Sequence, residues 1–417
     1  MDTIHAESTP PGRGGISVVR LSGPEARRIA EDLAGPLPQA RHSYLRRIVS
    51  DGQLIDHGLV VRFDARASFT GEDVVEFHLH GAPIISRLLQ EAVAARGARH
   101  ALPGEFTQRG FLNGQLGLSE AEALSDLLAA ETESQHRQAI RVADGALQEW
   151  AVQLRGKLVR AGALIAASID FADEDVPEDV PAEVFTLLDE VRDSIKAQLD
   201  GFPAAERLRD GFEVALIGPP NAGKSSLLNA IARREVALVT PVAGTTRDVL
   251  EVRIDLRGLA VTFLDTAGLR ETADHVERLG IDRANQRAAS ADLRVHLSED
   301  GRAVKELLQS GDVVITSKSD LREGDVSAIT GEGVVALLDR IHDILRARAA
   351  AADMVTRQRQ ADALRRASAG LQVSPSDPPE IVAESLNIAV NGLREVVGET
   401  GVEDYLDEVF SAFCIGK

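Results

Sequence analysis

The residues best suited to chemistry form one segment, Gly218 to Ser225, which reads Gly-Pro-Pro-Asn-Ala-Gly-Lys-Ser. It matches the pattern G-x-x-x-x-G-K-[ST] and stands between a strand-like apolar run and a helical pattern. Glycines let the backbone wrap phosphates so that N–H groups point inward at the positive end of a helix. Lys224 would neutralise the β- and γ-phosphates, and the Ser225 hydroxyl would bind Mg²⁺. The segment predicts a nucleoside triphosphate site.

Four further motifs follow in the order that a GTPase requires. A threonine in Gly244–Asp248 can complete the Mg²⁺ shell, and Asp265–Gly268 can hold a metal-bound water and sense the γ-phosphate. In Ser317-Lys-Ser-Asp320, the carboxylate can accept two hydrogen bonds from one edge of guanine, an edge that adenine lacks. Ser327–Gly331 would form the last loop around the base. We therefore predict a GTPase.

Two residues bear on how such a GTPase would activate water. Leu269 follows Asp-Thr-Ala-Gly, where Ras-like proteins keep a glutamine that orients the attacking water. Leucine cannot orient water, and another group must therefore take this role. Asn221 offers a carbonyl oxygen near the β–γ bridge, where a monovalent cation could replace an arginine finger. The alternative, that Asn221 only stabilises the turn, stays open.

Composition narrows the class of protein. The 417 residues suggest two or three domains at about 150 residues each. The net charge of −19 argues against a general nucleic-acid-binding surface, although a small basic site is allowed. One cysteine excludes an internal disulfide. Since there is neither a signal-peptide pattern nor an apolar run of membrane-spanning length, we expect a cytoplasmic protein with no membrane partner.

Periodicity predicts the domain organisation. The first hundred or so residues combine strand and helix patterns, with an alternating strand at Val74–His80. Residues 118–171 and 184–199 have a helical pattern, and residues 212–347 alternate strands with helices. Helical pattern then returns to the end. The two helical stretches are amphipathic and would pack on each other. We predict an α/β P-loop GTPase domain inserted into an all-α helical domain, preceded by an α+β domain. The expected boundaries are 1–116, 117–208, 209–350 and 351–417.

Several segments resemble the MnmE (TrmE) family of tRNA-modification GTPases, in collinear order over essentially the whole chain. They are Thr9–Ile16, Phe69–Glu76, His80–Pro83, Leu102–Asn113, Ala243–Asp248 and the terminal Cys414-Ile-Gly-Lys417. The resemblance implies a homodimer whose N-terminal domain binds a 5-formyl- or methylene-tetrahydrofolate. It implies K⁺-stimulated GTP hydrolysis. With the FAD-dependent partner MnmG (GidA), in a heterotetramer or larger assembly, such proteins add an aminomethyl or carboxymethylaminomethyl group at C5 of the wobble uridine of certain tRNAs.

The family's site residues carry over by matching positions. The residues that match K⁺ ligands are Asn221, Thr240, Val242 and Thr245, and those that match Mg²⁺ ligands are Ser225 and Thr246. Glu277 matches the residue that orients water indirectly. The residues that match the folate site are Arg20, Glu76, Gln115 and Lys417. Motifs and resemblance together predict a set of nucleotide-binding residues. They are Asn221, Ala222, Gly223, Lys224, Ser225, Ser226, Thr240, Thr245, Thr246, Asp265, Thr266, Ala267, Gly268, Ser317, Lys318, Asp320, Ser327 and Ala328.

The chain departs from the family pattern at two positions, and two other functions stay open, of which the second is suggested by Ser317. Ser317 stands in place of an asparagine, which removes an amide near the base, and Gln115 stands where many relatives have lysine. One alternative is a regulatory GTPase switch in ribosome or tRNA maturation. Another is a folate- or partner-binding scaffold with a weakened G domain. Taken alone, Glu277 reads as a solvated helix charge and Arg20 as a surface residue.

The C-terminal tail generates the first prediction. An apolar stripe of Val402, Leu406, Val409 and Phe413 would fix where Cys414–Lys417 emerges. Deleting residues 414–417 should abolish wobble-uridine modification in cells and leave GTP turnover and dimerisation intact, whereas Cys414→Ser alone reproduces the loss only if the thiol takes part. Nucleoside analysis of cellular tRNA measures this. Normal modified-uridine levels in the truncation strain would show an ordinary frayed end.

Overall fold

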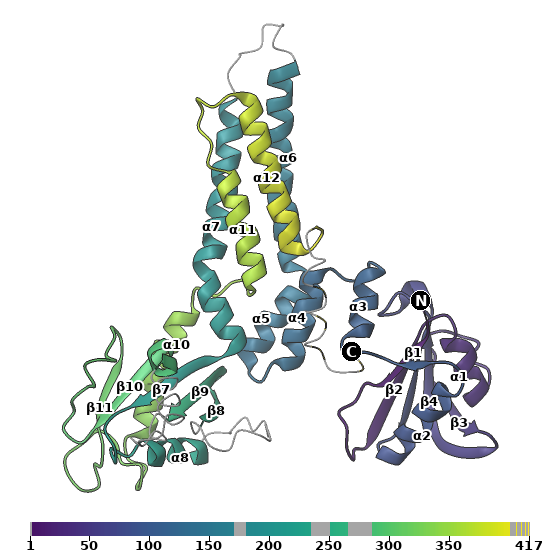
Figure 1. Ribbon diagram of the computed structural model, residues 1–417, viewed down its shortest axis with the longest axis horizontal. Helices are drawn as coiled ribbons and strands as arrows, with labels where there is room; N and C mark the ends of the chain where they lie inside the picture. The colour runs from purple at the N-terminus through teal and green to yellow at the C-terminus, as the bar shows by residue number, and fades with distance from the viewer. Residues whose placement is uncertain are drawn as a thin grey trace, which may run out of the picture. The chain divides into compact units, whose positions relative to one another are not determined.

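The computed structural model describes residues 2–170, 181–234, 251–265 and 286–400, together with Leu406, Phe410, Phe413 and Gly416. The chain forms two compact units, residues 1–125 with 394–417 and residues 126–393 (Figure 1). Within the described residues, none of the helices is long and apolar enough to cross a membrane.

The first unit is built on a six-stranded sheet with the order β3-β4-β5-β2-β1-β6. Its strands are β1 (Ile4–Glu7), β2 (Ile16–Ser22), β3 (Tyr44–Ser50), β4 (Gln53–Phe63), β5 (Val74–His80) and β6 (Arg99–His100). Neighbours are antiparallel except for β1 and β6. The predicted alternation in β5 is confirmed, because Val75, Phe77 and Leu79 are buried. The helical segments of this part are α1 (Ala26–Ala34), η1 (Ala65–Ala67), α2 (Pro83–Ala94) and α3 (Glu105–Leu112).

The stretch 118–171, predicted as one helical region, divides into three helices. They are α4 (Leu118–Ala129), α5 (Glu133–Ala143) and α6 (Ala146–Asp170). Thr132 and Gln135 form a capping box that starts α5, and Gly145, with φ 91°, lies between α5 and α6. The helix predicted at 184–199 extends at both ends as α7 (Ala182–Asp210). The acidic segment 171–180 lies outside the described residues.

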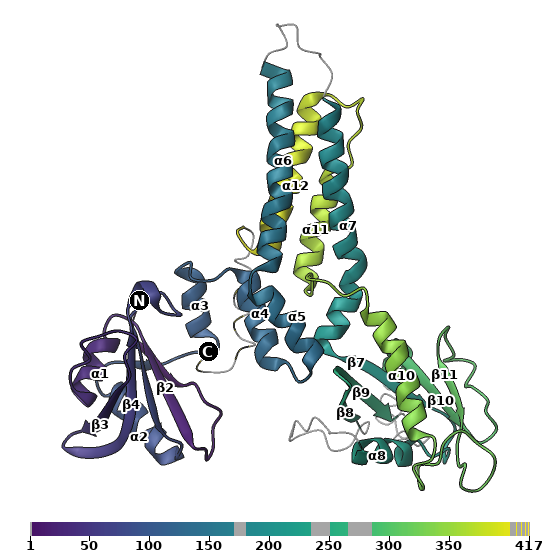
Figure 2. The same cartoon turned by 180° about the vertical axis from the view of Figure 1, so that it is seen from behind.

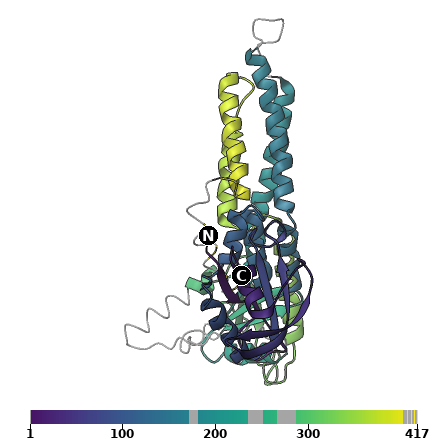
Figure 3. The ribbon, with the colours of Figure 1, turned by 90° about the vertical axis from the view of Figure 1, so that its right-hand side faces the viewer.

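The helices near the end of the chain pack against the long helices that precede the inserted domain. After α10 (Val334–Ala349) come α11 (Gln358–Gly370) and α12 (Pro379–Val397). Helix α11 contacts α7, and a Cβ atom on Gly162 of α6 would lie 3.9 Å from the Leu386 side chain of α12. Figures 2 and 3 show the long helices side by side. The predicted insertion of an α/β domain into a helical one is thereby confirmed.

The inserted domain contains a five-stranded sheet with the order β11-β10-β7-β9-β8. Its strands are β7 (Phe212–Ile217), β8 (Glu251–Leu256), β9 (Leu259–Asp265), β10 (Leu293–Ser298) and β11 (Val313–Thr316). All pairs are parallel except β8 with β9. Helices α8 (Lys224–Arg234) and α10 bury their apolar residues in one core with strand residues such as Phe263. A mostly parallel sheet of this kind collects its functional loops at the carboxyl ends of the strands.

A buried charge cluster holds the first unit together around Arg109. Its side chain is 4% exposed and donates to Glu72 at 3.0 Å, to Glu105 at 2.9 Å and to the Asp2 carboxylate at 2.8 Å. Glu105 is buried as well, yet hydrogen bonds from Arg99, the Leu102 N–H and Arg109 hold the pKa of its carboxyl below the usual range. Glu105 and Arg109 stand four residues apart on α3, and this spacing lets their side chains pair.

Removing the buried cation should be costly. Arg109→Leu leaves Glu72 and Glu105 short of a partner, and we expect the free energy of unfolding to fall by about 3 kcal/mol at pH 7. The loss should shrink as the pH falls below about 4.3, because the native state then no longer gains from ionised carboxylates. Urea denaturation of the full chain measures both effects. The exposed Arg87→Leu is the control, with a change of about 0.5 kcal/mol or less; an equal loss in the two variants would contradict the argument.

Candidate functional site: a phosphate loop and a guanine pocket

The loop between β7 and α8 has the shape that a phosphate site needs. A Cβ atom added to Gly218 would lie 2.0 Å from the Leu297 carbonyl oxygen of β10, so only glycine fits there. Asn221 (φ 61°) and Gly223 (φ 96°) both have left-handed backbone, which turns the chain tightly before α8 begins at Lys224. The loop therefore ends at a helix N-terminus, where backbone N–H groups attract anions.

Lys224 is held in this loop by backbone oxygens. Its ammonium donates to the carbonyl oxygens of Gly218 at 2.7 Å and Pro219 at 3.0 Å, and the residue is 4% exposed. Burial lowers the pKa of Lys224, and the nearby Asp265 carboxylate opposes that shift. The loop thus positions one cation beside the helix N-terminus, as binding of β- and γ-phosphates requires.

Two predicted metal-site residues meet directly. The Ser225 hydroxyl, on the first turn of α8, donates to the Asp265 carboxylate at the carboxyl end of β9. A hydroxyl and a carboxylate oxygen are the hard donors that Mg²⁺ prefers, and Mg²⁺ completes its shell with water and substrate phosphates. Among the described residues, no group of three or more His, Cys, Asp or Glu side chains is placed to hold a metal. The chemistry of this donor set fits Mg²⁺ bound together with a nucleotide.

A pocket of about 130 Å³ brings the phosphate loop and the base motifs together. Its lining includes Ala222, Gly223, Ser226, Ser317, Lys318, Asp320 and Ala328. The buried Ser327 hydroxyl donates to one oxygen of the Asp320 carboxylate at 2.6 Å. Asp320 itself is exposed, which leaves its carboxylate accessible to the N–H groups of a guanine.

The departure at Ser317 has a visible consequence. The Ser317 Oγ atom is buried and has no hydrogen-bond partner among the described residues, although its backbone N–H donates to the Ser298 carbonyl oxygen at 2.8 Å. Lys318, with φ 63°, pairs with Glu299, which also pairs with Arg322 at 2.6 Å. Sequence reasoning missed Glu299, because it follows β10 and no motif marks it.

The predicted folate residues Arg20 and Glu76 form an ion pair across β2 and β5, at 2.8 Å. A hydrogen bond from His78 and the charge of Arg20 hold the pKa of Glu76 below its usual value against the effect of burial. The Arg20 guanidinium lies 5.9 Å and 5.7 Å from the ring centres of Phe69 and Phe106. Because the Arg20 and Glu76 side chains are paired, both would contact the same end of a ligand.

The remaining predicted residues of the first unit are only partly described. Gln115 is exposed, and a Cβ atom on Gly71 would lie 3.2 Å from its Cγ. In the tail, the Gly416 carbonyl oxygen accepts a hydrogen bond from the Ser8 hydroxyl at 3.0 Å, and Gly416 packs closely on the Glu7 backbone.

The predicted residues that lie outside the described part are Thr240, Val242, Thr245, Thr246, Thr266, Ala267, Gly268, Glu277, Cys414 and Lys417.

The fold and site define a P-loop GTPase domain carried by a helical domain. Two family models match the chain: the MnmE helical domain over residues 118–414 and the GTP-binding protein TrmE N-terminus over residues 3–115. The chain is 57% identical to the tRNA modification GTPase MnmE of Paracoccus denitrificans, 48% to that of Roseobacter denitrificans and 49% to that of Ruegeria pomeroyi. Each of these alignments covers 100% of both chains. The chain belongs to the MnmE family of tRNA modification GTPases and hydrolyses GTP.

The unpaired Ser317 generates a prediction on nucleotide affinity. Ser317→Asn restores an amide at the buried position, and we expect GTP binding to tighten by about 1 kcal/mol if one net hydrogen bond is gained. Asp320→Asn should weaken GTP binding and relax selectivity toward xanthine nucleotides, whose ring carries a carbonyl at that edge. Titration with fluorescent nucleotides measures both. Ser319→Asn is the matched control, because the Ser319 hydroxyl faces Glu332 at 3.2 Å rather than the pocket; tightening by this variant too would refute the assignment.

Proposed function

We propose that this chain is a K⁺-stimulated GTPase that works as a homodimer with an FAD-dependent partner of the MnmG (GidA) type. Together they would add an aminomethyl or carboxymethylaminomethyl group at C5 of the wobble uridine of certain tRNAs. The observation that carries the proposal is the full-length match to MnmE proteins combined with a complete phosphate loop. The relatives are named as tRNA modification GTPases, and the wobble-uridine chemistry is what we propose for this chain.

The residues of the loop divide the work on GTP. Lys224 and the N–H groups at the start of α8 would bind the β- and γ-phosphates, and Ser225 with Asp265 would hold Mg²⁺, which neutralises developing charge on the phosphate oxygens. Thr246 would join them as a further side chain on the metal. Asp320, oriented by Ser327, would select guanine.

Water activation in this proposal does not use a glutamine, because Leu269 occupies that position. Asn221 lies in the tight turn of the loop with left-handed backbone. With Thr240, Val242 and Thr245 it would hold K⁺, whose charge can stand in for an arginine finger. Glu277 would orient the attacking water indirectly.

The one-carbon donor is assigned to the first unit. Arg20 and Glu76 would contact one end of a 5-formyl- or methylene-tetrahydrofolate, since they are paired at 2.8 Å. His78 and Arg20 favour the ionised form of Glu76, and an ionised carboxylate can accept hydrogen bonds from a pterin. Gln115 and Lys417 complete the proposed set.

The proposal is tested by two measurements on the same variant. We expect GTP turnover of the wild type to rise strongly in KCl over NaCl, and Asn221→Ala to lose that stimulation while it still binds GDP. In a strain that lacks the gene, the wild type should restore the modified wobble uridine and Asn221→Ala should not. Equal turnover in the two salts would refute the role of K⁺. Unchanged tRNA nucleosides in the deletion strain would refute the modification chemistry.

A further inference from the structure

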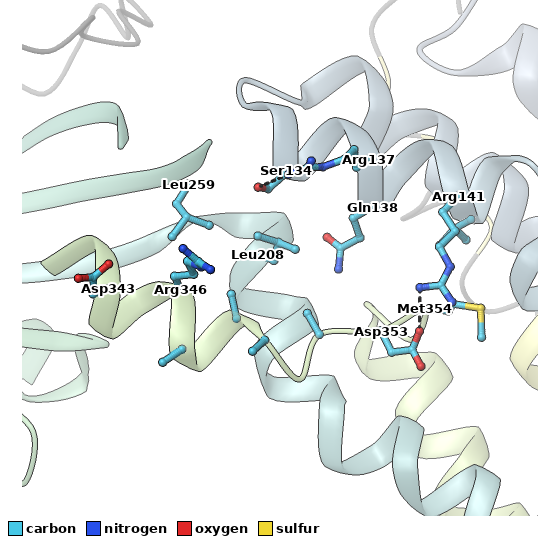
Figure 4. A pocket seen from close by; sticks show the side chains of 15 residues that line it. Ser134, Arg137, Gln138, Arg141, Leu208, Leu259, Asp343, Arg346, Asp353 and Met354 are labelled. Atoms are coloured by element: carbon cyan, nitrogen blue, oxygen red, sulfur yellow. Dashed lines mark hydrogen bonds and ion pairs between the residues drawn. The ribbon is translucent and has the colours of Figure 1, made fainter. Parts of the chain in front are cut away.

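A cavity of about 590 Å³ lies in the second unit. It opens where α5, the end of α7, the start of β9 and the end of α10 with the following segment meet (Figure 4). Its apolar lining includes Val142, Leu208, Leu259 and Met354, together with alanines of α10 and the segment after it. Its volume is that of a small-molecule site, and within the described residues its lining contains none of the predicted GTP or folate residues.

Arginines from two helices also line this cavity, beside its apolar residues. Arg137 and Arg141 come from α5, and Arg346 comes from α10. Figure 4 shows the Arg346 guanidinium beside Leu208 and Leu259. Across the described part of the chain, Arg346 has neither a hydrogen bond nor an ion pair. Its guanidinium is therefore an exposed cation beside an apolar surface, without a protein partner among the described residues.

The other charges of the cavity are largely matched. Arg141 pairs with Asp353 at 3.1 Å, and Asp343 lies 3.4 Å from the His342 ring. Arg137 is more loosely held, at 3.3 Å from Glu133 and 3.4 Å from the Ser134 hydroxyl, both at the surface. Arg137 and Arg346 are thus the cations available to a ligand. A guanidinium binds phosphate oxygens through two parallel hydrogen bonds.

We propose that this cavity binds a nucleoside phosphate unit, with the phosphate on Arg346 and the base or ribose against Leu208 and Leu259, which lie beside it (Figure 4). Two sources share this chemistry, a nucleotide of the tRNA and a free nucleotide. In a chain of net charge −19, such a cavity offers RNA a local cationic contact that the overall composition does not favour. The inference rests on membership of a tRNA-modifying family and not on the wobble chemistry or on K⁺.

The experiment uses the full chain with GDP and Mg²⁺ saturating the GTP site. There are two probes. Binding of uridine 5′-monophosphate is measured by calorimetry, and binding of an unmodified tRNA transcript is measured by filter binding over a range of KCl concentrations. Arg346→Ala removes the cation, and Ala347→Phe fills the cavity but keeps all arginines. Arg340→Ala is the matched control, because Arg340 is an exposed arginine of the same helix outside the described lining of the cavity.

Arg346→Ala should weaken binding about fivefold or more, as loss of one net hydrogen bond or more implies. Ala347→Phe should weaken it as well, because the phenyl ring takes space that the base or ribose would occupy. For tRNA, Arg346→Ala should also reduce the slope of log K against log salt by about 1, as loss of one phosphate contact requires. The control should stay close to the wild type, and GTP turnover should be unchanged in all three variants, which shows that they fold.

The two probes separate the two sources. A response with tRNA alone identifies an RNA contact, and a response with uridine 5′-monophosphate alone identifies a free nucleotide. If neither probe responds to Arg346→Ala or Ala347→Phe, the cavity is only a gap between packed elements and the proposal is wrong. Wobble-uridine levels in cells are read separately, so failure of the modification chemistry remains distinguishable from failure of this site.

Discussion

The parallel pairing of β7 with both β9 and β10 is the constraint on which the GTP site depends. It brings the carboxyl ends of three strands to one edge of the sheet, so that the phosphate loop after Ile217, the Asp265 carboxylate and the segment after Ser298 become neighbours. The fit is close, since Gly218 has no room for a Cβ beside β10. A change of register between β7 and β9 would separate Ser225 from Asp265, and the metal donors would no longer meet.

The same sheet is joined closely to the helical part of its unit. Helix α7 ends at Asp210 and β7 begins at Phe212, so that Gly211 alone connects them, with φ 96°. A Cβ atom on Gly211 would lie 3.2 Å from the Ala260 carbonyl oxygen of β9. On the other side, α10 leads within a few residues to α11, which packs on α7. The nucleotide-binding sheet is therefore connected to the helices by short segments of chain.

Buried charges fix positions that apolar packing alone would leave free. Just before β11, Asp312 accepts hydrogen bonds from Arg294 at 2.9 Å and faces His296 at 3.2 Å, with all three side chains almost inaccessible. Burial would raise the pKa of Asp312, yet the bonds from Arg294, the Gln309 N–H and His296 hold it below its usual value. An ion pair of this kind adds little net stability but penalises every register that separates its members. It specifies how β10 aligns with β11, the strand that leads to the base motif.

The amino-acid sequence by itself determined the class of this protein, because the phosphate loop, the guanine motif and the collinear family segments are local patterns. Periodicity also located β5, and the apolar run before the phosphate loop located β7. The amphipathic helical stretches implied the insertion that the contact of α11 with α7 confirms. Only the tertiary structure decided where 118–171 breaks into three helices, because one apolar stripe can continue across a turn such as that at Gly145. It likewise decided that Ser225 meets Asp265 and that Glu299 pairs with Lys318. These contacts join residues far apart in the chain, and the pairing of strands that brings them together follows from the packing of the whole sheet rather than from any local pattern.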